Sequence, residues 1–313
     1  EMLGIVFENL LPENIRRSKG TFYTPREVVE YMCENSLFEY LKEKSEHLFK
    51  KDLLRNFIFN KNFQISNIPE FENNSKFLDD LLLNVKICDP GIGSGAFAVS
   101  LMNLITKLRV KLINFFKRKY KNSSYYFKRD CIQNSIYGVD IDEYAVEITK
   151  LRLWLSLIVD QADYNDTEPL PNLDFKIVQG NSLLEEFEGF NLSSAIFHKK
   201  NKNLDMFSNE EEIKNSVKNL ADHQNTYLKT SSYSKKKILK KEIKLLMLDL
   251  LSKIITEDKY INLKSKKIKE NLNQLFSSKN IKNCFPWGIF FADVFFYNNG
   301  FDIIIGNPPY VDS

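Results

Sequence analysis

The stretch FDIIIGNPPY, at residues 301–310, reads as a buried strand that ends in a stiff polar and aromatic loop. Its three consecutive isoleucines are typical of a strand in a parallel sheet, which is covered on both faces. The two prolines after Asn307 restrict the backbone where the strand should stop. Because ligands of open α/β sheets bind at the carboxyl ends of the strands, this loop is predicted to carry functional side chains.

A glycine-rich turn lies upstream, between another apolar strand and the start of a helix. Residues 85–97 read VKICDPGIGSGAF, and the three glycines allow the backbone to approach a ligand beside the unpaired N–H groups of the helix. Asp89 stands directly before these glycines. A carboxylate at this place suits the ammonium group of methionine and would repel a pyrophosphate.

A second strand, IYGVDIDEYA at residues 136–145, ends in an acid placed to hold ribose hydroxyls. Asp140 is the candidate, and the alternative is an ordinary solvent-facing acid. In nicotinamide-binding units this acid follows the glycine loop by about twenty residues. Here it follows Gly95 at roughly twice that distance, so a dehydrogenase fits poorly unless residues 117–129 form an inserted loop. A helix is predicted over residues 143–157, with Asp142 and Glu143 at its N-terminus.

A third strand is predicted within residues 173–183, LDFKIVQGNSL, and stops at Gly180. Asn181 follows directly. As an amide at the end of a strand, it is a candidate for contact with a ligand through its side-chain oxygen. The alternative is that Asn181 caps a turn or a helix, as asparagine often does at the end of a strand.

The sequence Asn307-Pro308-Pro309-Tyr310 resembles the catalytic motif of S-adenosylmethionine-dependent amino methyltransferases, above all those that methylate adenine N6 in DNA. The resemblance implies that the Asn307 side chain and the Pro308 carbonyl accept hydrogen bonds from the target amine, while Tyr310 stacks on the base. Within a duplex the base must be flipped out of the stack to reach such a pocket.

The resemblance extends to residues 16–29, RRSKGTFYTPREVV, which are similar to the segment that closes over the cofactor in this family. Thr24 is also predicted to cap a helix that begins at Pro25. The cofactor contacts that the resemblance implies are Tyr23, Thr24, Pro25, Asp89, Pro90, Gly91, Gly93, Gly95, Phe97, Asp140, Ile141, Asn181, Ser182 and Asn307.

We therefore expect an α/β fold with a Rossmann-like, doubly wound methyltransferase sheet that is incomplete in this chain, which we expect to be a piece of a longer enzyme. An N-terminal helical segment is predicted at residues 1–84, a βαβ core at 85–189, a helical insertion at 190–284, and the last strand with its loop at 285–313. In that last part, Trp287 and Phe290 are predicted to pack in the core, with a place in the base pocket as the alternative.

The predicted insertion is strongly basic. Residues 199–282 hold twenty lysines and no arginine against ten acids, a net charge of +10 within a chain of net charge +3. Residues 234–255 show helical spacing of apolar side chains, with lysines between them: Ile238, Leu245, Leu248, Leu251, Ile254 and Ile255. The segment is either a solvated helical arm that packs this stripe on other helices, which we favour, or a hairpin that faces DNA phosphates.

Composition is that of an ordinary globular chain, with 43% hydrophobic and 27% charged residues and no apolar run that could span a bilayer. The four cysteines form no Cys-x-x-Cys pair and the three histidines do not have the spacing of metal ligands, so no metal site is predicted. The cysteines are expected to be reduced thiols in a cytoplasmic protein. The triplets at 212–214 and 242–244 resemble the end of a nuclease motif, but such triplets arise easily by chance in helices of this composition.

The chain as a whole is similar to the large adenine-specific enzymes of restriction-modification and phage-defence systems, of the type IIG or Eco57I-like kind. This similarity implies S-adenosylmethionine as cofactor, double-stranded DNA as partner, and nuclease or target-recognition domains on the same or a partner polypeptide. Two alternatives stay open: a protein glutamine methyltransferase, which uses the same four-residue loop, and a catalytically silent module that binds cofactor or DNA.

Overall fold

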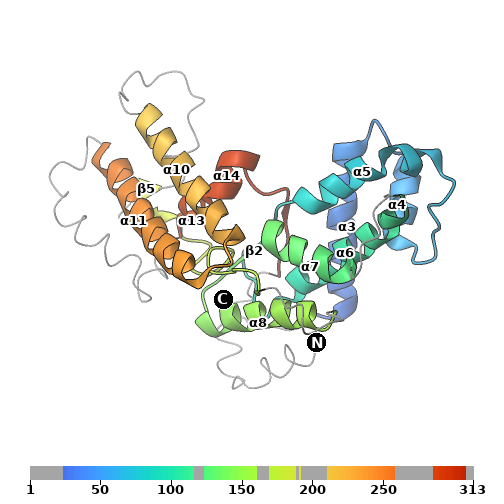
Figure 1. Cartoon of the computed structure of the whole chain (residues 1–313), viewed down its shortest axis with the longest axis horizontal. Helices are drawn as coiled ribbons and strands as arrows, with labels where there is room; N and C mark the ends of the chain where they lie inside the picture. The colour runs from blue at the N-terminus through green and yellow to red at the C-terminus, as the bar shows by residue number, and fades with distance from the viewer. Residues whose placement is uncertain are drawn as a thin grey trace, which may run out of the picture. The chain divides into compact units, whose positions relative to one another are not determined.

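The computed structural model describes residues 24–115, 123–160, 169–187, 190–191, 210–257 and 285–307. It divides the chain into two compact units, whose elements are drawn in Figure 1. The first unit comprises Glu1–Gly138, Glu143–Pro171 and Phe301–Ser313. The second comprises Val139–Asp142 and Asn172–Gly300. Each unit therefore combines segments that are far apart in the sequence.

The main sheet has four strands in the order β3-β2-β1-β6. The strands are β1 (Ile87–Asp89), β2 (Ile136–Asp140), β3 (Ile177–Gln179) and β6 (Ile303–Ile304). β1 pairs in parallel with both β2 and β6. The expectation of an α/β fold with a parallel sheet is confirmed, and the doubly wound Rossmann-like arrangement stays a prediction. β4 (Glu186–Phe187) and β5 (Phe190–Asn191) form a separate antiparallel pair.

The predicted strand of three isoleucines is shorter and less buried than expected. β6 contains Ile303 and Ile304, and Ile305 continues the pairing through its N–H, which donates to the carbonyl of Cys88. Ile303 and Ile305 are buried, but Ile304 is 70% exposed. Side chains alternate between the faces of a strand, and β6 stands at the end of the strand order. The prediction that both faces of this strand are covered is therefore wrong at Ile304.

Helices make up most of the described part of the first unit, which has its core around α6. They are α3 (Arg26–Ser45), α4 (Lys51–Phe59), α5 (Pro69–Asn84), α6 (Ala96–Leu112), the 3-10 turn η1 (Ile113–Phe115), α7 (Ser123–Asn134) and α8 (Glu143–Ile158). α6 packs against α3, α5, α7 and α8. The predicted helix at 143–157 is confirmed as α8. Of the run at 117–129, considered above as an inserted loop, residues 123–129 belong to α7 and the others lie outside the described residues.

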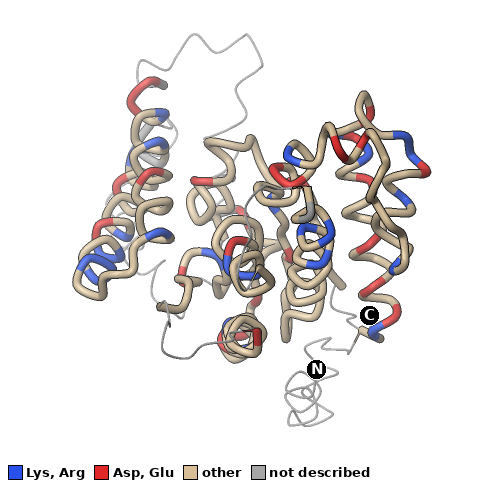
Figure 2. The backbone as a smooth tube through the Cα atoms, turned by 45° about the vertical axis from the view of Figure 1, so that its right-hand side comes forward, with Lys and Arg blue, Asp and Glu red and all other residues tan. Residues whose placement is uncertain are grey.

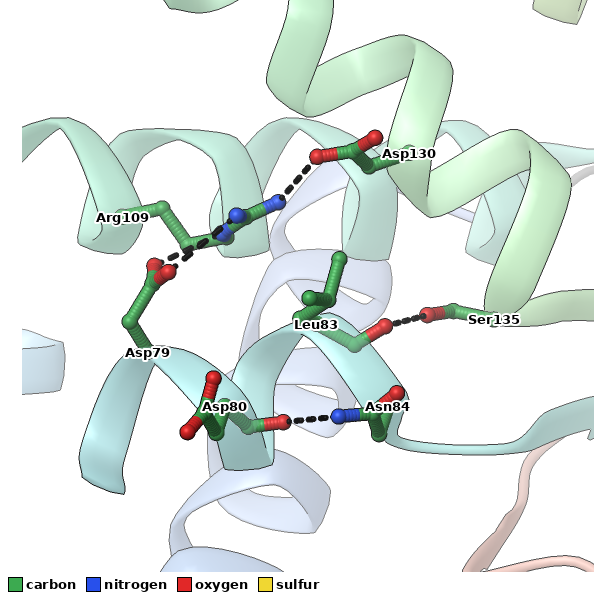
Figure 3. A network of polar contacts seen from close by, with 7 residues as sticks. All are labelled: Asp79, Asp80, Leu83, Asn84, Arg109, Asp130 and Ser135. Atoms are coloured by element: carbon green, nitrogen blue, oxygen red, sulfur yellow. Dashed lines mark hydrogen bonds and ion pairs between the residues drawn. The ribbon is translucent and has the colours of Figure 1, made fainter. Parts of the chain in front are cut away.

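A buried guanidinium connects three of these helices (Figure 3). Arg109 on α6 donates two hydrogen bonds to the Asp79 carboxylate on α5, at 2.7 and 3.2 Å, and one to Asp130 on α7, at 3.0 Å. Its cationic carbon also lies 4.1 Å from the ring centroid of Phe127. Burial alone would lower the pKa of Arg109, but its hydrogen bonds to the Asp79 and Asp130 carboxylates and their negative charges outweigh this effect, so the pKa is raised. This network stabilises the packing of α5, α6 and α7, and α6 is the helix into which the loop after β1 leads.

The second unit holds the two long helices of the basic insertion. α10 (Glu210–Lys229) and α11 (Tyr233–Glu257) pack side by side (Figure 1), and α10 also packs on α14 (Ala292–Asn298), which follows α13 (Trp287–Phe290). The buried amide of Gln224 on α10 donates to the carbonyls of Ile289 and Phe290 and accepts from the N–H of Asp293. These bonds satisfy backbone groups around the junction of α13 and α14.

The helical prediction for residues 234–255 is confirmed, but the predicted apolar stripe is partly wrong. Ile238 and Leu245 are 58% and 57% exposed, whereas Leu251 and Ile254 are buried as expected. The buried side chains of α11 are Ile243, Met247, Leu250, Leu251 and Ile254. These residues follow a spacing of three and four, so they share one side of the helix while Ile238 and Leu245 lie on the other.

The third predicted strand is also shorter than expected. β3 covers only Ile177–Gln179, because the N–H groups of Lys176 and Ile177 turn back to the carbonyl of Leu173. Phe285 packs against Gly180, where an added Cβ would lie 2.2 Å from the Phe285 ring. Phe290 stacks on Phe285 with 4.6 Å between ring centroids and is buried. Core packing of Phe290 is thus confirmed, within the second unit.

None of the helices in the described ranges is both long enough and apolar enough to cross a membrane. Cys33, Cys88 and Cys131 are buried and reduced. Cys284, the fourth cysteine, lies outside the described residues.

Asp79→Ala should lower the free energy of unfolding by about 3 kcal/mol, because it leaves the buried Arg109 guanidinium with unmade hydrogen bonds. Urea denaturation measures this loss. The control is Glu30→Ala, which removes an exposed ion pair to Arg26 and should cost less than about 1 kcal/mol. Equal and small losses in the two variants would contradict the role given to Arg109.

Burial raises the pKa of the Cys33 thiol to about 12 and raises that of Cys88 well above its ordinary value. Only the thiolate reacts with iodoacetamide, so both thiols should stay unmodified at pH 8.5 in the native protein. In urea both should react readily. Peptide mapping after alkylation checks this, and equal modification in the native and the denatured protein would show that these thiols are not buried.

Candidate active site

The ends of β1 and β6 bring the central residues of two predicted motifs together in the first unit. Asp89 is the last residue of β1, is 3% exposed, and accepts a hydrogen bond of 3.1 Å from the N–H of Gly91. Asn307 follows β6, and its side-chain amide donates a 3.1 Å hydrogen bond to the Thr24 hydroxyl. Glycine loop, Asn307 and Thr24 therefore lie at one edge of the sheet, as their positions after parallel strands predict.

Gly306 allows these two segments to approach closely. A Cβ on Gly306 would lie 2.8 Å from a carboxylate oxygen of Asp89, and a Cβ on Gly91 would lie 3.9 Å from the carbonyl oxygen of Asn307. The residue before Asn307 must therefore be glycine if Asp89 is to keep its position. Gly306 was not identified as a site residue from the sequence.

The glycine loop is held from α8 by two polar side chains. The Thr149 hydroxyl donates a 2.8 Å hydrogen bond to the carbonyl of Gly93, and the Arg152 guanidinium donates to the carbonyl and hydroxyl of Ser94. Gly95 has a φ of +80°, and a Cβ there would lie 2.8 Å from the Thr149 methyl group. Gly95 is therefore required for both its backbone conformation and its contact with α8.

Thr149 and Arg152 were not identified as site residues from the sequence. They lie three positions apart on α8, so they share one side of that helix. Their spacing in the sequence indicates that the two side chains lie on one side of the helix. It does not reveal that this side faces a loop more than fifty residues earlier in the chain.

The predicted capping role of Thr24 is wrong. Helix α3 begins at Arg26 with Pro25 at the N-cap position, and no side chain makes a capping hydrogen bond. The Thr24 hydroxyl instead accepts the amide of Asn307. This fixes the orientation of that amide: its nitrogen faces Thr24, so its oxygen is the atom left to accept a hydrogen bond from another group.

The remaining candidates of the first unit differ in exposure. Phe97 lies in the first turn of α6 and is buried, Pro90 is half-buried, and Pro25 is exposed. Tyr23, Pro308, Pro309 and Tyr310 lie outside the described residues.

The second unit holds the other candidates, next to one another at the ends of β2 and β3. The Asp140 carboxylate accepts a 2.9 Å hydrogen bond from the N–H of Asp142, and its carbonyl accepts one from Gly180. The Asn181 side-chain oxygen accepts from the N–H of Leu183 at 3.2 Å, which is the turn-capping role considered above. Ile141 and Ser182 interact through their carbonyls, with Gln179 and Trp287 respectively.

The first-unit residues fit the methionine part of S-adenosylmethionine. A carboxylate that a neighbouring N–H already orients can accept further hydrogen bonds from an ammonium group. Gly91 and Gly93 beside it leave space that a Cβ would fill, whereas Gly95 is in close contact with Thr149. Among the described residues no group of three or more His, Cys, Asp or Glu side chains could hold a metal ion.

Comparisons with known proteins agree with this chemistry. The family model described as "Eco57I restriction-modification methylase" matches residues 134–313. A Methanocaldococcus jannaschii protein described as "Putative type II restriction enzyme and methyltransferase RM.MjaORFECS2P" is 27% identical, across 99% of this chain and 30% of that protein. The Escherichia coli "Type II restriction enzyme and methyltransferase RM.Eco57I" is 24% identical, across 59% of this chain and 18% of its own length.

The chain thus spans less than a third of the length of either relative. The family match covers more than half of the chain and includes β2, β3, β6 and the Asn-Pro-Pro-Tyr sequence. The chain belongs to the Eco57I restriction-modification methylase family.

Proposed function

We propose that the protein transfers a methyl group from S-adenosylmethionine to the N6 amine of adenine in double-stranded DNA, as part of a restriction-modification system. The observation that carries this proposal is the position of the Asn307 amide, which Thr24 orients beside Asp89 and the glycine loop. Family membership supports methylation, and the Asn-Pro-Pro-Tyr sequence supports an amine as its target.

The proposed cofactor supplies a methyl group on a positively charged sulfur. Asp89 would hold the ammonium of its methionine part, and Gly91, Gly93 and Gly95 would allow the backbone to approach it. Thr149 and Arg152 keep this loop in one conformation, so little conformational entropy would be lost when the cofactor binds. Asp140 and Asn181 are the proposed contacts of the ribose hydroxyls and the adenine ring.

The target amine is a poor nucleophile, because its lone pair is conjugated with the purine. The Asn307 side-chain oxygen and the Pro308 carbonyl would accept hydrogen bonds from its two N–H groups and hold the nitrogen so that its lone pair faces the methyl group. Tyr310 would stack on the flipped base. The Thr24 hydroxyl contributes by keeping the Asn307 oxygen available as an acceptor.

The printed names of both relatives combine restriction with methylation. We propose the same combination for the whole protein, with nuclease and target-recognition domains on the same or a partner polypeptide. The rival reaction is methylation of a protein glutamine, because that side-chain amide poses the same problem of a conjugated lone pair.

Incubation of the full-length protein with labelled S-adenosylmethionine and unmodified duplex DNA should yield N6-methyladenine. Nucleoside analysis after digestion identifies the product. Label found only on cytosine or on protein would falsify the proposal, and label on glutamine would favour the rival reaction.

Thr24→Val keeps the size of the side chain but removes the acceptor that orients the Asn307 amide. We expect kcat for methyl transfer to fall roughly tenfold to hundredfold, because a misplaced catalytic group costs rate rather than affinity. Thr24→Ser, the matched control, keeps the hydroxyl and should retain most of kcat.

Single-turnover rates and KM for S-adenosylmethionine are measured for both variants. A rise in KM with unchanged kcat in Thr24→Val would mean that Thr24 serves the cofactor and not Asn307. That result would remove the positioning role while leaving the proposed reaction in place.

A further inference from the structure

Charge is segregated along the α10–α11 hairpin of the second unit. Residues 229–244, here called the basic turn, contain seven lysines and one glutamate, a net charge of +6. The other residues of the two helices, 210–228 and 245–257, contain three lysines and six acids, a net charge of −3. Figure 2 shows the blue segments gathered where α10 joins α11, with red segments toward the other end.

The lysines of the basic turn are available to a partner. Lys240 pairs with Asp174 at 2.7 Å. Across the described ranges, no acidic side chain lies within ion-pair distance of Lys235, Lys236, Lys237, Lys241 or Lys244. At the opposite end of the hairpin, Lys253 is neutralised by Glu212 and Asp249. Positive charge without a nearby acid is therefore concentrated at the end of the hairpin where α10 joins α11.

Packing holds these lysines on the outer side of α11. The helix packs against α10 and buries the stripe that contains Ile243, Met247 and Leu250, while the lysines at 235, 237, 241 and 244 are exposed. Lys237, Lys241 and Lys244 are spaced by four and three residues, so they form one row about 10 Å long. Such a row spans about three nucleotide steps of one DNA strand at 3.4 Å each.

The composition of the basic turn favours phosphate contacts over reading of bases. Lysine is a point charge without the planar fork with which arginine binds guanine. Hydroxyl groups accompany the lysines at Ser231, Ser232, Tyr233 and Ser234, all of them exposed, and hydroxyls are common donors to phosphate oxygens.

We propose that the basic turn at residues 229–244 is a docking surface for the phosphate backbone of duplex DNA, which it binds without regard to sequence. The proposal rests on the proposed function, because duplex DNA is the polyanion that a DNA methyltransferase must hold. It gives the basic insertion a task separate from chemistry: the surface adds a salt-dependent attraction for the substrate. The sequence alone favoured a solvated helical arm. The exposed lysines of the basic turn lead us to prefer the alternative, contact with DNA phosphates.

The test compares two double variants of the full-length protein with the same change in net charge. K235E/K237E alters the basic turn, and K214E/K218E alters exposed lysines of α10 outside it. Affinity for a duplex that lacks any methylation is measured from about 50 to 200 mM salt, a range over which phosphate contacts dominate the salt dependence.

For K235E/K237E, the slope of log affinity against log salt should fall in magnitude by about 2, since each phosphate contact contributes about 0.9. The slope of K214E/K218E should stay unchanged. An unchanged slope in K235E/K237E, or an equal fall in both variants, would overturn the proposal. Binding of S-adenosylmethionine, measured by calorimetry, should be unaltered in both variants. An unchanged salt slope would therefore overturn the docking surface without contradicting the proposed methyl transfer.

Discussion

The parallel pairing of β6 with β1 is the constraint on which the site depends. The Lys86 carbonyl accepts the N–H groups of Asp302 and Ile303, the Cys88 carbonyl accepts that of Ile305, and the Asp302 carboxylate accepts the N–H of Lys86. These bonds join segments more than two hundred residues apart and fix the register. Because of that register, Asp89 and Asn307 leave the sheet at the same edge.

Polar side chains from helices then hold each loop in place. Thr149 and Arg152 fix the glycine loop through its carbonyls, and Thr24 fixes the Asn307 amide. Each of these side chains makes a hydrogen bond with a polar group of the loop that would otherwise need water as its partner. A site held in this way before any ligand arrives suits a reaction in which orientation of a weak nucleophile supplies much of the rate.

Local patterns predicted the four strands of the main sheet and the helices α8 and α11, because short apolar runs before glycine or proline and helical spacing are both properties of neighbouring residues. Non-local contacts limited the rest. Thr24 looked like a helix cap, but its partner lies 283 residues away. An inserted loop at 117–129 was considered only as the condition under which a dehydrogenase would fit, and residues 123–129 are part of α7, whose Lys128 pairs with Asp160. Ile238 and Leu245 looked buried, but only packing decides which side of α11 faces inward.

The most direct measurement is a crystal structure of the protein with S-adenosylhomocysteine, which keeps the amino acid part of the proposed cofactor. We expect its ammonium to lie about 3 Å from the Asp89 carboxylate, over the glycines at 91–95. A ligand bound elsewhere with those glycines uncovered, or an Asn307 amide turned away from Thr24, would contradict it.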